Sequence, residues 1–314
     1  MKNLTKKLLV LLIVIIPALV SAELTNVYQP NPTVENTVSA QSKALPKQDD
    51  GKILSAKNSS LVSWTSKPIL DNPMNFHFAI VSDRTGGHRS NIFRNAMHKI
   101  NLLQPEFVMS VGDLIEGATT NVTVLNKELT EMASFLNILQ MKFYRVPGNH
   151  DIGNPAMLKV YKEHFGSPYY HFIYKNVLFL ILSTEDPPVS KISDAQVEYV
   201  KKTLQDNKNV KWTLVFMHEP LFMKAYDGKN QNWLKIEKLL DNRKYNLFAG
   251  HYHGYQKFIR NGHKYIRLAT TGGASNLSGI KNGAFDQIMW VTMTDNGPVI
   301  ANIALNGLLD EDLK

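Results

Sequence analysis

The sequence predicts an α/β fold in which two packed sheets are flanked by helices. From about residue 68 onward, strand-like apolar runs alternate with segments whose apolar residues recur at helical spacing, which is typical of a sheet covered by helices. Two pairs of strands joined by short turns, at residues 169–182 and 287–305, predict a second, partly antiparallel sheet. Hydrophobic residues make up 44% and charged residues 20% of the 314, an ordinary globular composition that disfavours a mostly disordered chain.

The first half of this region alternates strand and helix. Phe76–Val81 is a β-rich run that ends in a turn, and apolar residues at helical spacing predict a helix over Ile92–Leu103, which Pro105 ends. Similar patterns predict a strand at Phe107–Val111, a helix at Lys127–Leu139, a strand at Phe143–Val146 and a helix at Ala156–Phe165.

The second half adds hairpins to this alternation. Lys175-Asn176 joins two apolar strands, and Ser193 is a suitable N-cap for a helix that ends at Leu204. The elements expected here are strands at Tyr169–Tyr174, Val177–Leu182, Trp212–Met217, Asn246–Ala249 and Tyr265–Thr270, a helix at Trp233–Asn242, and a final hairpin of Gln287–Met293 and Val299–Leu305.

Three segments divide the chain. Residues 1–22 contain three lysines, then 13 largely apolar residues and a small-residue end at Ala22, which predicts a cleaved signal peptide and a periplasmic or secreted protein. The apolar run is shorter than the ~20 residues that a membrane-crossing helix needs, and no later stretch approaches that length. Residues 23–66 are polar and lack periodicity, which predicts a flexible linker. Residues 67–314 are expected to form one domain.

Several classes of function are excluded or disfavoured. The absence of cysteine excludes disulfides, thiolate zinc sites, iron–sulfur clusters and a cysteine nucleophile. The net charge of +8 slightly favours anionic partners, but the lysines are scattered and no nucleic-acid-recognition motif is present. No dinucleotide fingerprint, P-loop or serine-hydrolase elbow occurs.

Metal-ligating residue types follow the ends of five predicted strands. These residues are Asp83, Asp113, Asn149 to Asp151, His218, and the pair His251 and His253. Because the carboxyl ends of parallel strands meet at one edge of a sheet, we expect them to converge. Carboxylates, imidazoles and an amide form a mixed ligand set that suits Mn, Fe, Zn or similar divalent ions.

Glycines and spacing support this interpretation. Gly112, Gly148 and Gly250 each directly precede a candidate ligand, where the chain must turn sharply off a strand and come close to an ion. His251 and His253 are two positions apart and would point oppositely in a regular strand. From a tight turn both can face a site, and this spacing suits two adjacent metals better than one.

With these ligand-bearing segments, the sequence resembles the calcineurin-like metallophosphoesterases. The segments lie within about residues 76–273 and follow one another in the same order as in that family. The matching segments are Ser82-Asp83, Gly112-Asp113, Gly148-Asn149-His150-Asp151, His218 and Gly250-His251-Tyr252-His253. The resemblance implies that residues 67–314 form a four-layer α/β/β/α sandwich of two packed mixed sheets flanked by helices. It also implies a dinuclear centre of two divalent metal ions at the strand ends.

The resemblance further implies a role for each residue. Asp113 would bridge the two ions, Asp83 and His253 would hold the first, and the second would be held by Asn149, His218 and His251. His150 would protonate the leaving oxygen, and Asp151 would fix the tautomer of His150. The implied reaction is hydrolysis of a phosphate ester by attack of a metal-bound hydroxide.

One position departs from the family pattern. The first motif is usually Asp-x-His, but here it reads Asp83-Arg84-Thr85, and a hydroxyl is a poorer ligand than imidazole. The occupancy of the first metal site is therefore open: water could complete it, or His88 could reach it from the next turn. Arg84, through its planar guanidinium, and His88 are also candidates for binding the substrate phosphate.

We therefore expect an exported, metal-dependent phosphoric ester hydrolase, either a phosphatase or a phosphodiesterase, whose partner is a phosphate-ester substrate. The alternative is a catalytically weak metal- or phosphate-binding protein on the same fold, which the presence of Thr85 favours. Counting the bound ions separates the two hypotheses, since two ions per chain favour the enzyme.

Overall fold

The computed structural model describes residues 65, 67–186, 190–224 and 230–308. The predicted signal peptide lies outside the described residues, as does the predicted linker apart from Thr65. Residues from 66 onward form one structural unit, and all the elements given below belong to it.

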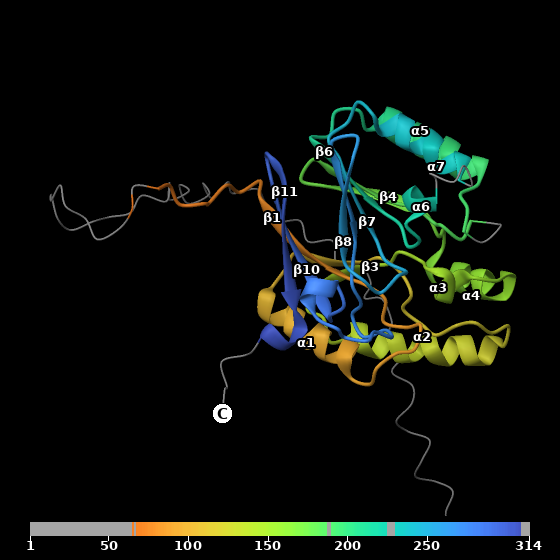
Figure 1. Cartoon of the computed structure of the whole chain (residues 1–314). Coiled ribbons are helices and arrows are strands. Elements are labelled where there is room, and N and C mark those ends of the chain that lie inside the picture. Colours follow the sequence, from red (N-terminus) through yellow and green to blue (C-terminus); the bar gives the residue numbers. More distant parts are fainter. Residues whose placement is uncertain (1–64, 66, 187–189, 225–229, 309–314) are drawn as a thin grey trace, which may run out of the picture. The chain divides into compact units, whose positions relative to one another are not determined.

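Two mixed sheets form the centre of this unit (Figure 1). The first has the strand order β11 (Gly297–Ala304), β10 (Gln287–Thr294), β1 (Phe76–Val81), β2 (Phe107–Ser110) and β3 (Lys142–Tyr144). The second has the order β4 (Tyr170–Tyr174), β5 (Val177–Ile181), β6 (Trp212–Phe216), β7 (Tyr245–Ala249), β9 (His263–Arg267) and β8 (Gln256–Arg260).

Helices cover the outer faces of both sheets (Figure 1). The first sheet is covered by α1 (Ile92–Leu103) and α2 (Val122–Leu136), with α4 (Pro155–Phe165) beside them. The second sheet is covered by α5 (Asp194–Asp206) and α7 (Gln231–Leu240). Short helices lie at α3 (Asn149–Ile152), α6 (Leu221–Lys224), Ile280–Asn282 and Leu305–Gly307. The predicted α/β/β/α sandwich is therefore confirmed.

Three apolar clusters hold the four layers together. The central cluster lies between the sheets and contains Phe78, Phe179 and Phe216, all fully buried. The other two clusters fill the spaces between each sheet and its helices. Burial of one such phenyl ring stabilises the fold by roughly 1.5–3 kcal/mol, so the inter-sheet cluster is a large contributor to stability.

Parallel pairing determines where the loops of the site meet. Strands β1, β2 and β3 are parallel in the first sheet, and β5, β6, β7 and β9 are parallel in the second. The carboxyl ends of parallel strands lie at one edge of their sheet. The loops after β1, β2, β3, β6 and β7 carry the candidate ligands.

Among the differences between the fold and the expectation are strand β8 and the start of helix α2. Strand β8, which pairs with β9, is not predicted by the sequence reasoning. Helix α2 begins at Val122, five residues before the predicted start, because the Asn121 side chain accepts hydrogen bonds from two backbone N–H groups of its first turn. Within the described part of the chain, no helix combines the length and apolarity needed to cross a membrane.

Candidate metal centre

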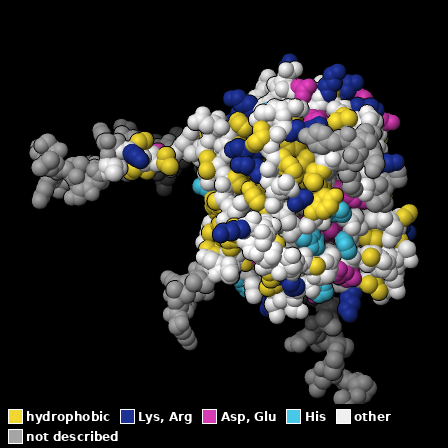
Figure 2. Space-filling model, in the orientation of Figure 1, with side chains coloured by type: hydrophobic (Ala, Val, Ile, Leu, Met, Phe, Trp, Pro, Cys, Tyr) yellow, Lys and Arg dark blue, Asp and Glu magenta, His cyan; other side chains and the backbone are white. Residues whose placement is uncertain are grey.

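Two groups of candidate ligands share one carboxylate. Asp113, His218 and His251 form one group, and Asp83, Asp113 and His253 form the other; in each, the ligand atoms lie within 4.8 Å of one another. Asp113 belongs to both groups and is only 2% exposed. Figure 2 shows histidine side chains gathered on one face of the molecule. The predicted assignment of His251 and His253 to different ions matches this division.

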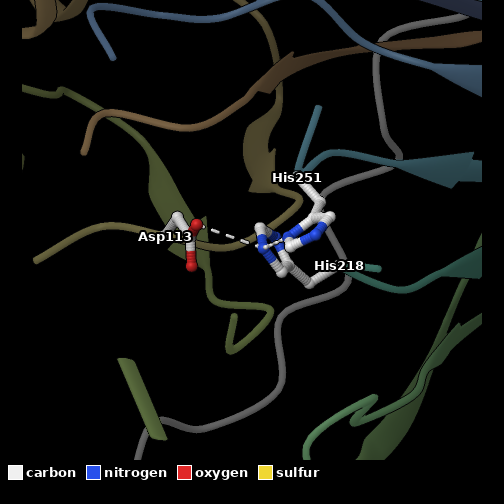
Figure 3. A group of neighbouring side chains, drawn as sticks. All are labelled: Asp113, His218 and His251. Carbon is white, nitrogen blue, oxygen red and sulfur yellow. Dashed lines mark hydrogen bonds and ion pairs between the residues drawn. The ribbon is translucent and has the colours of Figure 1, made fainter. Parts of the chain in front are cut away.

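The group that contains His218 is compact (Figure 3). Nε2 of His218 lies 3.1 Å from Oδ2 of Asp113 and 3.2 Å from Nδ1 of His251. Oδ1 of Asn149 lies 3.0 Å from the same His218 nitrogen and 2.9 Å from Nδ1 of His251. The four residues proposed for the second ion are therefore brought together.

The chemistry of these donor atoms fits a cation. Nδ1 of His218 lies 2.8 Å from the carbonyl oxygen of Val111, which can only accept, so Nδ1 carries the hydrogen. The lone pair of Nε2 then faces the carboxylate of Asp113, the amide oxygen of Asn149 and a nitrogen of His251. Such a convergence of electron-pair donors needs either a proton or a metal ion at its centre.

The electrostatic environment of these residues agrees with this picture. Burial lowers the pKa of His218, but the charge and hydrogen bond of Asp113 and the charge of Asp83 outweigh it and raise the pKa to about 10. Burial raises the pKa of Asp113, yet His218 and His150 bring it below its usual value. Burial and the neighbouring His218 lower the pKa of His251. In the ion-free protein, the proton on His218 balances the buried carboxylates.

In the group of Asp83, Asp113 and His253, which is assigned to the first ion and is called the first ligand group below, a backbone carbonyl orients the histidine in the same manner. Nδ1 of His253 lies 2.6 Å from the carbonyl oxygen of Ala274, which leaves Nε2 to face Oδ1 of Asp83 at 3.5 Å. That Asp83 oxygen also accepts a hydrogen bond from the backbone N–H of His251, at 2.8 Å. The loop at 270–274 binds back to Asp83, whose carbonyl accepts from Gly273 at 3.0 Å.

Thr85 is placed as a structural residue. It is fully buried. Its hydroxyl donates to the carbonyl oxygen of Ile115 at 2.8 Å, and its backbone N–H donates to the carbonyl of Asp113 at 3.2 Å. The first ligand group therefore contains one imidazole, whereas the other contains two.

Three of the candidate ligands have a left-handed backbone conformation. Asp113, His251 and His253 have φ angles of 56°, 75° and 52°, a conformation that costs non-glycine residues roughly 1–2 kcal/mol each. Gly148 has a different reason to be glycine, since a Cβ there would lie 2.2 Å from Oδ1 of Asp113. Gly250 likewise leaves room for the carboxylate of Asp83. The glycines therefore accommodate ligands from other loops.

Comparison with known proteins now identifies the family. The sequence profile described as calcineurin-like phosphoesterase matches residues 76–255, which spans every residue of both ligand groups. The chain belongs to the calcineurin-like phosphoesterases. No curated protein sequence matches the chain at a significant level.

Solved structures share the fold at low sequence identity. A purple acid phosphatase from yellow lupin has a TM-score of 0.58 and 13% identity, over 75% of this chain and 52% of its own. The protein GAP50, described as the anchor in the inner membrane complex of Plasmodium, has a TM-score of 0.56 and 16% identity, over 75% and 86%. A dimetal phosphatase from Danio rerio has a TM-score of 0.51 and 16% identity, over 73% and 99%. These similarities support the fold alone.

The structure corrects the role that the phosphoesterase resemblance implies for Asp151. Its carboxylate accepts hydrogen bonds from the backbone N–H groups of Asp113 and Gly148, both at 2.8 Å, and of Leu114 and Ile115 at 3.0 and 3.3 Å. Burial and the nearby Asp113 raise its pKa to about 6. Asp151 therefore ties two ligand loops together and does not orient the His150 ring.

A backbone carbonyl orients His150 instead. Nδ1 of His150 lies 2.6 Å from the carbonyl oxygen of Glu116, so Nδ1 carries a hydrogen and this contact fixes the orientation of the ring. A Cβ at Gly86 would lie 3.6 Å from this Nε2 and 2.9 Å from Cε1 of His253. The His150 ring therefore lies beside the ligand group of Asp83.

Arg84 and His88 are engaged with protein groups. The buried guanidinium of Arg84 donates to the carbonyl of Leu114 at 3.1 Å and to Glu131 at 2.7 Å. This position does not match the prediction that Arg84 presents its guanidinium to a phosphate. His88 lies in neither ligand group, and its Nδ1 is 2.7 Å from a carboxylate oxygen of Glu116.

The sequence reasoning assigned no role to several acidic residues near the site. Glu116 accepts from the backbone N–H groups of Gly87 and His88 and so fixes the turn that follows Asp83. Glu185 and Glu219, each 2% exposed, follow β5 and β6 at the same sheet edge. Burial and the neighbouring Glu219 raise the pKa of Glu185 to about 7. The position of Glu185 and Glu219 in the loops after β5 and β6 was the sequence signal that could have identified them.

Proposed function

We propose that this protein is a phosphoesterase that hydrolyses phosphate esters at a dinuclear metal centre. The observation that carries the proposal is the carboxylate of Asp113, which belongs to both ligand groups in a chain of the calcineurin-like phosphoesterase family. A shared carboxylate between two donor sets is the arrangement that a pair of cations needs.

The residues present fit two divalent ions. Asp83, Asp113 and His253 would hold the first, and the second would be held by Asp113, Asn149, His218 and His251. When bound, two such ions lower the pKa of a water molecule and neutralise charge on the phosphoryl oxygens. The imidazole donors among these ligands favour Mn, Fe, Zn or similar ions over Mg.

His150 supplies the proton for the leaving group in this proposal. Its Nδ1 hydrogen is held by the Glu116 carbonyl, so the ring is fixed and Nε2 is the atom that can deliver a proton to the leaving oxygen. A residue in that role typically contributes about 10²–10⁴ in rate. Asp151 contributes by keeping the loops of Asp113 and Asn149 in register.

The test is hydrolysis by protein loaded separately with Mn, Fe, Zn and Mg, with 4-nitrophenyl phosphate as monoester and bis(4-nitrophenyl) phosphate as diester. We expect hydrolysis of at least one ester, and we expect Asp113→Asn to abolish both hydrolysis and metal binding. Asp194→Asn is the matched control, because this aspartate is exposed on α5. Absence of hydrolysis with every metal and both esters would count against the enzyme.

A second candidate function is metal or phosphate binding without efficient hydrolysis. The observation that favours it is Thr85, which gives its hydroxyl to Ile115 and leaves the first group with a single imidazole. The same fold also occurs in a protein described as an anchor. Elemental analysis separates the candidates: two ions per chain support the enzyme, and one ion favours the binding protein.

Export is proposed from the leader sequence. Residues 1–22 have the charge, apolar run and small-residue end of a signal peptide. The intact mass of protein recovered from the extracytoplasmic fraction should correspond to a chain that begins at residue 23. Recovery of the full-length mass from the cytoplasm would contradict export.

A further inference from the structure

A recess with aromatic walls, none of whose lining residues is a candidate ligand, lies where β3 and β4 are the edge strands of their sheets. Its volume is about 330 Å³. It lies between β3, β4 and α4 and is lined by Phe143, Tyr144, Arg145, Tyr161, Phe165, Ser167 and Tyr170. Ligand sites for small molecules begin at about 300 Å³, so this recess has room for a single ring.

The guanidinium of Arg145 has no hydrogen bond or ion pair in the described part of the chain. Its carbon lies 4.3 Å from the ring centre of Phe165 and 5.8 Å from that of Phe143, and its N–H groups make no hydrogen bond or ion pair with any described residue. Only its backbone carbonyl is bonded, by the Tyr170 hydroxyl at 2.8 Å. Arg145 therefore presents five unused donors.

A second donor lies in the same recess. Tyr161 is 5% exposed, and its hydroxyl has no hydrogen bond to any residue within the described ranges. Its ring packs edge-on against Phe165, at 5.1 Å between ring centres. Arg145 and Tyr161 thus line one recess whose other lining residues are mainly aromatic.

The charge of Arg145 is poorly balanced. The groups that interact with it electrostatically are Tyr161, Tyr170 and Asp151, and only Asp151 is a carboxylate. Four backbone N–H groups already bind that carboxylate. Burial lowers the pKa of Arg145, but a guanidinium keeps its charge at neutral pH. A partly buried, unpaired cation is stabilised by an incoming anion.

We propose that this recess binds a small carboxylate carried on an aromatic ring. A carboxylate can take two parallel hydrogen bonds from the guanidinium of Arg145, and the Tyr161 hydroxyl can donate a third. The ring would pack on the aromatic walls, where offset or edge-on contacts are favourable. This site is separate from the proposed phosphoesterase centre, so its test does not depend on hydrolysis.

The test measures binding to the full, metal-loaded chain by ¹⁹F NMR and calorimetry. The probes are 4-fluorobenzoate, the neutral 4-fluorobenzamide, and inorganic phosphate. We expect 4-fluorobenzoate to bind at least tenfold more tightly than the benzamide, and Arg145→Met to remove this preference. Tyr161→Phe, which keeps the packing, should weaken benzoate binding about threefold. Arg94→Met on the exposed face of α1 is the control and should change nothing.

Two further outcomes decide the location and the ligand class. Asp113→Asn, which should empty the metal centre, is expected to leave the affinity for 4-fluorobenzoate unchanged; loss of binding there would overturn the proposal. Equal affinity for the benzoate and the benzamide, or tighter binding of inorganic phosphate that depends on Arg145, would also overturn it. Absence of ester hydrolysis would contradict only the proposed function.

Discussion

A proton and a divalent cation compete for one position at His218. Its Nε2 faces Asp113 and His251 at 3.1 and 3.2 Å, and its pKa of about 10 in the ion-free protein arises because Asp113 outweighs the effect of burial. Because the raised pKa keeps the ring protonated below about pH 10, a metal ion must displace that proton.

Metal binding at pH 8 is therefore expected to release about one proton per chain from His218. The measurement is calorimetry in two buffers that differ in ionisation enthalpy, since the difference in observed heat gives the number of protons. The release should diminish as the pH rises through about 10. A binding heat that is the same in both buffers at pH 8 would contradict this assignment.

The roles of His150 and the metal ligands can be separated by one substitution. His150→Ala removes the Nε2 that faces the centre but none of the atoms in the two ligand groups. We expect kcat to fall by about 10²–10⁴ while metal content stays at the wild-type level. His164→Ala on the exposed end of α4 is the control. If His150→Ala loses its metal, the residue is a ligand.

Thr85 can be tested as a structural residue by removing only its hydroxyl. Thr85→Val keeps the shape but leaves the buried carbonyl of Ile115 without its donor, which costs about 1–2 kcal/mol in the free energy of unfolding. Thr85→Ser keeps the hydroxyl and should lose less. Metal stoichiometry should be unchanged in both variants, and a loss of one ion in Thr85→Val alone would identify the hydroxyl as a ligand.

At the scale of elements, hydrophobic pattern predicts what is buried and misses what is exposed. The bounds predicted for β1 and α1 are those observed, since both elements present several buried apolar residues. Strand β8 was not predicted because it is an edge strand whose side chains, including Lys257, are exposed or partly exposed. The Asn261-Gly262 turn, with φ angles of 50° and 78°, was its available signal.

The sequence predicts which loops form the candidate site, but it does not predict the hydrogen bonds within the site. Strand ends and glycines are visible in the sequence, so the loops of Asp83, Asp113 and His218 could be expected to meet. The partners of Asp151 are four backbone N–H groups, and backbone donors leave no mark on a sequence. The resemblance therefore implied that Asp151 contacts the adjacent His150. In the fold, the Asp151 carboxylate instead binds backbone N–H groups of the loops after β2 and β3.

Asp151 on α3 accepts hydrogen bonds from the loop after β2. We expect these hydrogen bonds to be essential to both stability and metal binding. Asp151→Asn turns an amide NH₂ toward donors that need an acceptor, which we expect to cost about 2–4 kcal/mol in the free energy of unfolding. Metal affinity should fall with it, because Asp113 and Asn149 lie on the two joined segments. Urea unfolding and elemental analysis measure both effects, with Asp194→Asn as control. Unchanged stability would contradict this role.

At the scale of the molecule, the candidate metal centre is a product of topology. Parallel strands β1 to β3 in one sheet and β6 and β7 in the other place five ligand-bearing loops at the strand ends, and the inter-sheet core holds the two edges in register. Solved structures at 13–16% identity share this fold, among them two described as phosphatases and one described as an anchor. The fold thus provides the position, and the ligands in the loops decide the chemistry.

The contacts of the segment before β1 predict how much of the N-terminal region the folded unit needs for its stability. The unit begins at residue 66, and the segment before β1 is fixed to it by three side-chain hydrogen bonds. Asn72 donates to Asp295 at 2.8 Å, and Lys175 donates to the carbonyls of Pro73 and Asn75 at 2.8 and 3.1 Å. These contacts are exposed or partly buried, so together they stabilise the unit by about 1 kcal/mol.

A chain that begins at residue 66 should therefore match the longer chain in melting temperature, metal content and ester hydrolysis. A chain that begins at Phe76 loses the Asn72, Pro73 and Asn75 contacts and should melt a few degrees lower, because about 1 kcal/mol corresponds to such a shift in a domain of this size. Both should keep their metal content, since every ligand follows Phe76. Loss of metal from the chain that begins at residue 66 would mean that the preceding residues take part in the site.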